Sequence, residues 1–137
     1  MRIILDTNLW ISYLISNRFL RLDQLLQDQQ LTILFSQELL EEFIEVAQRP
    51  KFQNYFSPED LKALLQVFYQ FGTLIEIESN LPFEEDPKDS FLLNLAKDGQ
   101  ADFLITGDKA LLKLTRLGTT RIITYTEFES YIDDQSA

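Results

Sequence analysis

The sequence contains neither cysteine nor histidine, and it holds only four glycines and four prolines in 137 residues. Without cysteine, a disulfide framework and a thiolate zinc site are excluded, and without histidine the usual general base and commonest zinc ligand are missing. Any chemistry must therefore rest on carboxylates, hydroxyls, amides, lysine and arginine. Because no tract is rich in glycine or proline and no segment repeats, we expect one domain over residues 1–137, with only its last few residues frayed.

Long hydrophobic runs and positive charge are also scarce. No apolar stretch approaches the roughly 20 residues needed to cross a bilayer, and Asp6 and Asn8 interrupt the N-terminal run, unlike a signal peptide. We therefore expect a soluble, cytoplasmic protein without a membrane segment. The formal net charge is −10, from 22 acidic and 12 basic residues. Such a surface repels nucleic acid, so a nucleic-acid substrate would require bound cations or a basic strip.

The apolar pattern alternates between strand-like and helix-like segments. Strands are predicted at residues 2–5, 31–35, 73–77, 102–106 and 121–125. In the first half of the chain, helices are predicted from about Leu9, around 20–27, after the N-cap Ser36, and from Ser57 to Gly72. In the second half, they are predicted from Asp86 to Gly99, after Asp108, and from a capping box of Thr126 and Glu129 to about Asp133. Strands separated by helices pair in parallel, which predicts an α/β fold, a three-layer α/β/α sandwich with a central, mostly parallel sheet.

Two carboxylates follow predicted strands. Ligands of open parallel sheets bind beyond the carboxyl ends of the strands. Asp6 comes one residue after the first strand, and Asp108 comes two residues after the strand "DFLIT". If these strands are neighbours, both carboxylates lie at one edge of the sheet. Each is also a favourable helix cap, so neither residue by itself decides between a cap and a ligand.

Two more carboxylates are selected by their positions on predicted helices. At about 100° per residue, Glu42 lies about 115° from the centre of its helix's apolar face, closer than the other glutamates of that helix. In "DPKDSFLLNLAKDG", Asp89 lies about 65° from the apolar centre and Asp86 about 125°. A carboxylate on an apolar face is costly unless it is paired or binds a metal. Asp89 is therefore the functional candidate, and Asp86 is expected to cap the helix.

Four carboxylates at one end of a sheet cannot all stay ionised without a counter-charge. With only oxygen ligands available, the expected counter-charge is a hard divalent cation, Mg²⁺ or Mn²⁺. Such an ion can bind a phosphodiester, stabilise its in-line displacement and lower the pKa of the attacking water. With no histidine available, a metal-activated water is the expected nucleophile.

Four segments of the chain resemble a known family. They are "ILDTN", "SQELLEEFIEVAQRPKF", "DPKDSFLLNLA" and "ADFLITGDKALL", and in this order they look like PIN-domain nucleases, specifically the VapC-like bacterial toxins of toxin–antitoxin pairs. The resemblance implies an Mg²⁺- or Mn²⁺-dependent endoribonuclease. Its implied catalytic residues and metal ligands are Asp6, Glu42, Asp89 and Asp108.

The same resemblance implies roles for further residues and partners. Asn8 and Thr106 match supporting polar positions beside the acids, and Asp102 is expected to be peripheral. The implied partners are an RNA substrate, a cognate antitoxin and a second copy in a homodimer. Apart from the resemblance, the negative net charge means that RNA phosphates would need a basic rim at the site. The apolar residues of the first helix are candidates either for the core or for a dimer or antitoxin surface. The rim comprises Arg49, Lys51, Lys109 and Lys113, and the apolar residues are Trp10, Tyr13 and Leu14.

Two other interpretations remain open at this stage. A haloacid-dehalogenase-type phosphatase would also begin with an aspartate at a strand end. That family needs a second aspartate two residues later, where this chain has Asn8. In the other interpretation the protein is a non-catalytic binding module of the same fold, in which the acids only cap helices.

Overall fold

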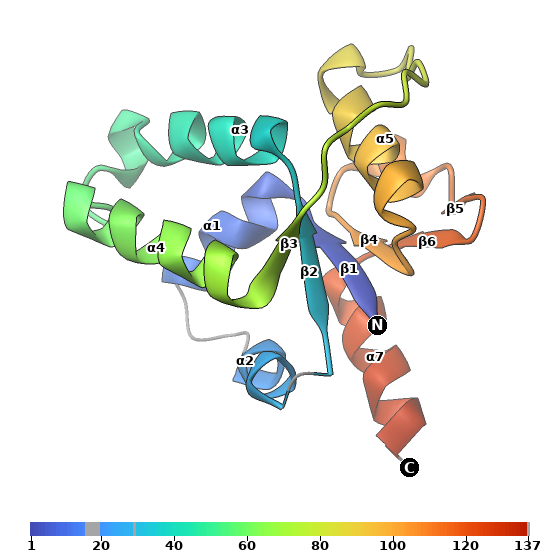
Figure 1. Cartoon of the computed structure of the whole chain (residues 1–137), viewed down its shortest axis with the longest axis horizontal. Helices are drawn as coiled ribbons and strands as arrows, with labels where there is room; N and C mark the ends of the chain where they lie inside the picture. The colour runs from blue at the N-terminus through green and yellow to red at the C-terminus, as the bar shows by residue number, and fades with distance from the viewer. Residues whose placement is uncertain (16–19, 29, 137) are drawn as a thin grey trace.

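The computed structural model describes residues 1–15, 20–28 and 30–136, and these form one mostly parallel sheet of six strands with helices around it (Figure 1). The strand order is β3-β2-β1-β4-β6-β5, and only β5 runs antiparallel to its neighbour. The strands are β1 (Arg2–Leu5), β2 (Thr32–Phe35), β3 (Gly72–Leu74), β4 (Phe103–Ile105), β5 (Arg116–Leu117) and β6 (Thr120–Ile123). The predicted α/β class with a mostly parallel sheet is confirmed.

The helices follow the predicted order. They are α1 (Thr7–Ile15), α2 (Leu20–Gln27), α3 (Gln37–Ala47), α4 (Pro58–Phe71), α5 (Ser90–Gly99), α6 (Lys109–Leu112) and α7 (Tyr125–Ser136), with 3₁₀ turns η1 (Pro50–Phe52) and η2 (Pro87–Asp89). Two expectations for strands were wrong: the predicted strand 73–77 ends at Leu74, and the short strand β5 was not foreseen. No helix in the described ranges is long and apolar enough to cross a membrane.

Different helices cover the two faces of the sheet. On one face, Phe35 of β2 contacts Phe68 of α4 with ring centroids 5.4 Å apart, and Phe103 of β4 contacts Phe128 of α7 at 5.7 Å. On the other face, α5 packs so closely that a Cβ on Gly99 would come within 2.8 Å of Leu34 Cδ1. Helices on both faces make the predicted three-layer sandwich. Each fully buried large apolar side chain contributes about 1.5–3 kcal/mol to folding.

The apolar residues of α1 belong mainly to the core. Trp10 is only 1% exposed, and its ring lies 4.5 Å from that of Phe68 and 5.8 Å from that of Tyr13. Of the two alternatives for Trp10, the structure shows the core rather than a dimer or antitoxin surface, because α4 covers this side of α1. Tyr13 is half-buried against the same core, and the side chain of Leu14 lies outside the described part of the structure.

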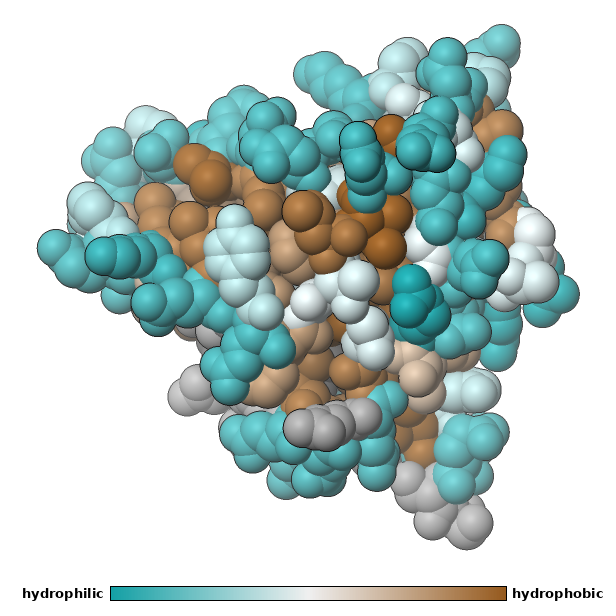
Figure 2. Space-filling view, in the orientation of Figure 1, coloured by the Kyte–Doolittle hydropathy of each residue, from teal (hydrophilic) through white to brown (hydrophobic). Residues whose placement is uncertain are grey.

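Apolar surface gathers instead over α3 and α4, where Figure 2 shows brown residues bordered by polar ones. Half-buried residues of these helices pack against the core while remaining partly accessible, among them Ile44, Leu61 and Leu65. Tyr69 of α4 is 68% exposed. This surface is therefore a more accessible apolar region than the α1 residues selected from the sequence.

The last helix begins two residues earlier than predicted. Thr124 and Glu127 form the capping interaction: the backbone N–H of Thr124 donates to Glu127 Oε1 at 3.2 Å, and that of Glu127 donates to Thr124 Oγ1 at 3.2 Å. The predicted box of Thr126 and Glu129 was wrong because the same spacing occurs twice, and the end of β6 at Ile123 selects the first copy. The helix extends through Ser136, and Ala137 of the predicted frayed end lies outside the described residues.

Candidate active site

The first two candidate acids follow neighbouring strands. β1 and β4 pair in parallel with Leu5 beside Ile105, and the backbone N–H of Asp6 donates to the carbonyl of Ile105 at 3.0 Å. This adjacency, on which the predicted site depends, is confirmed. Asp102 precedes β4 at the opposite end, where its Oδ2 accepts a hydrogen bond from the Arg2 backbone at 2.8 Å. It lies apart from the candidate site.

A cleft of about 460 Å³ opens at the carboxyl edge of the sheet. It is lined by Asp6, Thr7, Asn8, Leu9, Ser12, Glu42, Val46, Arg49, Asp86, Lys88, Asp89, Gly107 and Asp108. All four predicted acids therefore face one cavity, although they come from β1, α3, η2 and the start of α6. Asn8 lies on the lining and is exposed to solvent.

Thr106 connects the two strand-end acids from beneath the cleft. It is fully buried, and its Oγ1 donates to Asp6 Oδ2 at 2.7 Å and accepts from the Asp108 backbone N–H at 3.0 Å. Asp108 also caps α6, because its Oδ1 accepts from the Ala110 backbone at 2.8 Å. Asp108 therefore both caps α6 and lines the cleft, two roles that were alternatives on the sequence alone.

Thr7 positions the glutamate and was missed in the sequence. Its side chain is buried, and its Oγ1 donates to Glu42 Oε2 at 2.6 Å, which links the start of α1 to α3. This contact holds the Glu42 carboxylate toward the cleft. The available signal was the run Asp6-Thr7-Asn8, three polar residues where an apolar pattern breaks.

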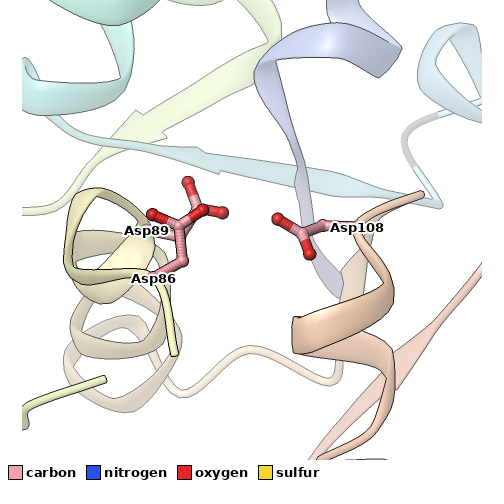
Figure 3. Close-up of side chains that lie close together, drawn as sticks. All are labelled: Asp86, Asp89 and Asp108. Atoms are coloured by element: carbon pink, nitrogen blue, oxygen red, sulfur yellow. The ribbon is translucent and has the colours of Figure 1, made fainter. Parts of the chain in front are cut away.

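Asp86 lies closer to the other acids than the sequence suggested. The segment is not one continuous α-helix: η2 ends at Asp89 and α5 begins at Ser90. Because side chains three residues apart eclipse one another in 3₁₀ geometry, Asp86 and Asp89 share one side and face Asp108 (Figure 3). One oxygen of each of the three carboxylates lies within 4.8 Å of the others. The predicted separation of Asp86 from Asp89 was wrong, although Asp86 does cap η2 by accepting from the Lys88 backbone at 3.3 Å.

Known proteins share the fold of this chain. A family profile described as "PIN domain" matches residues 2–110. The chain belongs to the PIN-domain family. A chain of VapBC2 from Rickettsia felis, in a crystal structure with a DNA fragment from their promoter, has the same fold, with a TM-score of 0.58 and 18% identity over 89% of this chain and 97% of that one. No curated protein matches significantly. The phosphatase alternative, already weakened by Asn8, has no support from the family match.

Burial, hydrogen bonds and neighbouring charges shift the pKa values of three acids of this PIN domain. Burial raises the pKa of Asp6, and the charges of Glu42 and Asp108 raise it further, against the opposing hydrogen bond from Thr106. Burial, the hydrogen bond with Asp108 and the charges of neighbouring acids raise the pKa of Asp89 to about 8. The same hydrogen bond lowers the pKa of Asp108. Without a cation, Asp89 and Asp108 therefore share a proton near neutral pH.

The arrangement fits a hard divalent cation. Oxygen ligands about 2.1 Å from an octahedral ion lie about 3 Å apart when adjacent and about 4.2 Å when opposite. The spacing of the Asp86, Asp89 and Asp108 oxygens, within 4.8 Å, requires only a small adjustment to meet these values. Asp6 and Glu42 face the same cleft outside this closest group. Replacing the shared proton with a cation would also offset the burial and the charge repulsion that raise the pKa of Asp89.

The basic rim differs in part from the prediction. Arg49 lines the cleft and forms an exposed ion pair with Glu45 at 3.6 Å. Lys51 and Lys109 are exposed but do not line it, and Lys51 Nζ lies 4.9 Å from the centre of the Phe52 ring. Lys88, which was not selected in the sequence, lies on the lining between the two acids of η2.

Replacing Thr106 with valine should weaken metal binding. Valine keeps the volume but removes the hydrogen bond that orients Asp6, and loss of such a partner typically reduces metal affinity 10- to 100-fold. Titration calorimetry with Mn²⁺ would measure the change. Thr120→Val is the matched control, because Thr120 is equally buried and donates to the Ala101 carbonyl at 2.6 Å, outside the cleft lining. Equal Mn²⁺ affinity for wild type and Thr106→Val would contradict this role.

Proposed function

We propose that this PIN domain is an Mg²⁺- or Mn²⁺-dependent endoribonuclease that hydrolyses phosphodiester bonds of RNA. The catalytic residues and metal ligands in this proposal are Asp6, Glu42, Asp89 and Asp108. One observation carries it: these carboxylates, from separate elements, line one cleft at the carboxyl edge of the sheet. Because the chain has no histidine or cysteine, the cleft offers acids rather than an imidazole or a thiol for this chemistry.

Each residue of the cleft would have a role that its position determines. Asp89 and Asp108 would exchange their shared proton for the cation, with Asp86 beside them as a further oxygen ligand. Thr106 and Thr7 would hold Asp6 and Glu42 in fixed orientations through their hydrogen bonds. A bound Mg²⁺ or Mn²⁺ supplies positive charge for the phosphoryl group and lowers the pKa of the attacking water. Asn8, exposed at the cleft, would contact the substrate.

The proposal includes the toxin role in a toxin–antitoxin pair. It is supported by the fold shared with a chain of VapBC2 and by the PIN family. A cognate antitoxin would then act as a protein partner in the cytoplasm, and a homodimer would form the active unit. The accessible apolar residues over α3 and α4 offer a surface for such protein contacts. Expression should therefore arrest growth, and product mapping on total cellular RNA would identify the cleaved sites.

The direct test is cleavage of single-stranded RNA by the purified protein. We expect cleavage with Mg²⁺ or Mn²⁺, none after chelation, and recovery when the ion is restored. A single-stranded DNA of the same sequence serves as the control for substrate class. Absence of both Mn²⁺ binding in calorimetry and RNA cleavage would favour the non-catalytic binding module. Mn²⁺ binding without cleavage of RNA would contradict the proposed ribonuclease.

A further inference from the structure

Positive charge is segregated in this acidic chain. Residues 109–126 carry four cations and no carboxylate, in a protein with 22 acidic and 12 basic residues. These cations are Lys109, Lys113, Arg116 and Arg121, and all four are exposed. The segment starts directly after Asp108 and continues through α6, β5 and β6. One end of this basic segment therefore lies at the candidate active site.

The hairpin of β5 and β6 places two arginines directly opposite each other. Its antiparallel register pairs Arg116 with Arg121 and Leu117 with Thr120. The two-residue turn Gly118-Thr119 fixes this register, and Gly118 has the positive φ of 58° that such turns require. Like charges directly opposite in a sheet are destabilising. In the described ranges, neither guanidinium has a carboxylate partner within salt-bridge distance.

Arg121 is oriented by aromatic rings. Its guanidinium carbon lies 5.6 Å from the ring centre of Phe103 and 6.0 Å from that of Tyr131. Such stacking leaves the planar edge of a guanidinium available for hydrogen bonds. Because Arg121 pairs with Phe103 in parallel register, its side chain and that of Arg116 lie on the face of the sheet that α7 covers.

A cavity of about 380 Å³ is lined by both arginines and Thr115. Its only acidic lining residue is Glu127, and Glu127 Oε1 already accepts hydrogen bonds from the backbone and hydroxyl of Thr124 at 3.2 and 3.0 Å. The cavity thus offers two guanidinium groups that form no salt bridge with a carboxylate among the described residues. Phosphate oxygens are well matched to this arrangement, because arginine binds phosphate through two parallel hydrogen bonds.

We propose that Arg116 and Arg121 form a phosphate clamp for the RNA strand that extends from the cleft, with Lys109 and Lys113 contacting phosphates between them. This inference rests on the proposed ribonuclease function. Lys109 and Lys113 are four residues apart and so lie on one side of α6. The series of cations suits the repeating charge of a phosphodiester chain, and it begins beside the acids that would cleave that chain.

The register of β4 and β6 also indicates how far the clamp lies from the cleft. Arg121 lies beside Phe103, three residues before Thr106, which corresponds to about 10 Å along the sheet. A substrate of two nucleotides would occupy the cleft without reaching the clamp. The clamp therefore predicts a contribution to binding that depends on RNA length.

The test measures RNA binding by Arg116→Gln/Arg121→Gln in an Asp6→Asn background, so that cleavage does not interfere. Two phosphate contacts on a single strand contribute roughly 20-fold to affinity at 0.1 M salt and about 1.4 to the slope of log K against log salt. We expect losses of this size for a long oligonucleotide and none for a dinucleotide. Lys62→Gln/Lys97→Gln is the matched control, because it removes two exposed cations outside residues 109–126.

Two outcomes would overturn the clamp. Equal losses of RNA affinity in the arginine and the lysine double variants would show an effect of net charge alone. Unchanged RNA affinity together with lost binding of an acidic protein partner would make the hairpin a protein-binding surface. If the double variant does not fold, Arg116→Gln/Arg121→Lys keeps a cation over the rings and removes only one, so the salt slope should fall by about half as much, roughly 0.7. Arginine-dependent RNA binding by a wild-type protein that never cleaves RNA would refute the ribonuclease while leaving the clamp standing.

Discussion

Asp6→Asn should abolish RNA cleavage in Mg²⁺ or Mn²⁺ while leaving the fold intact. The substitution removes the charge of a buried carboxylate in the cleft. The amide oxygen of asparagine can still accept a hydrogen bond from the Thr106 hydroxyl. The loss should exceed the roughly 10- to 100-fold that removal of a ligand's partner causes, because a ligand itself is removed. Cleavage rates at saturating metal, together with the melting temperature, would measure both effects.

The melting temperature of this variant should be unchanged or higher. Burial raises the pKa of Asp6, which means that folding disfavours its charged form, and asparagine carries no charge to desolvate. Asp102→Asn is the matched control, because it makes the same chemical change at the opposite end of β4, where Asp102 is exposed. Normal cleavage by Asp6→Asn, or an equal loss in Asp102→Asn, would contradict the assigned role.

Mn²⁺ affinity should rise about tenfold per pH unit between about pH 5 and 8, and then level off. The metal requires ionised carboxylates, whereas the raised pKa of Asp89, about 8, means that the metal-free protein holds a proton there over most of this range. Binding should therefore release about one proton per ion. Calorimetry in two buffers with different ionisation enthalpies would count that proton. Binding independent of pH over this range would contradict the shared-proton pair.

The stability of the metal-free protein should fall as pH rises, whereas its Mn²⁺ affinity rises. Between the ordinary aspartate pKa of 3.8 and about 8, the folded protein holds a proton at Asp89 that the unfolded chain has lost. Stability consequently falls as pH rises through this window. Melting temperatures from pH 4 to 8 should show that decline, and Asp89→Asn should make it shallower than in wild type. Added Mn²⁺ should raise the melting temperature more at pH 8 than at pH 5.

Local interactions explain which helix ends could be read from the sequence. The helix α4 begins after Ser57 as predicted, because Ser57 and Asp60 bond each other's backbone across one turn, at 3.0 and 3.1 Å. The start of α7 was ambiguous because two threonines have a glutamate three residues later. The choice between them depended on where β6 ends, which is set by pairing with β4 rather than by the helix.

Gly99 also shows which features depend on the local sequence and which depend on tertiary contacts. Gly99 was read as the residue that ends α5, yet the left-handed conformation there belongs to Gln100, with φ 51°. Gly99 is the last residue of the helix, where a side chain would collide with Leu34. The pattern indicated correctly that the helix stops there. The reason for glycine, a close approach of helix and sheet, depends on a residue 65 positions earlier in the chain.

The sequence by itself determined the order of strands and helices, the acids that follow β1 and β4, and the dependence of any chemistry on oxygen ligands, because periodicity, capping and composition are local or additive properties. The tertiary structure decided that Asp86 joins Asp89 and Asp108, that Thr7 orients Glu42, and that Arg116 faces Arg121. Each of these depends on the 3₁₀ geometry of η2 or on contacts between segments distant in the chain or paired by strand register. Side-chain convergence of this kind is set by packing and pairing, which the spacing of residues along the chain does not specify.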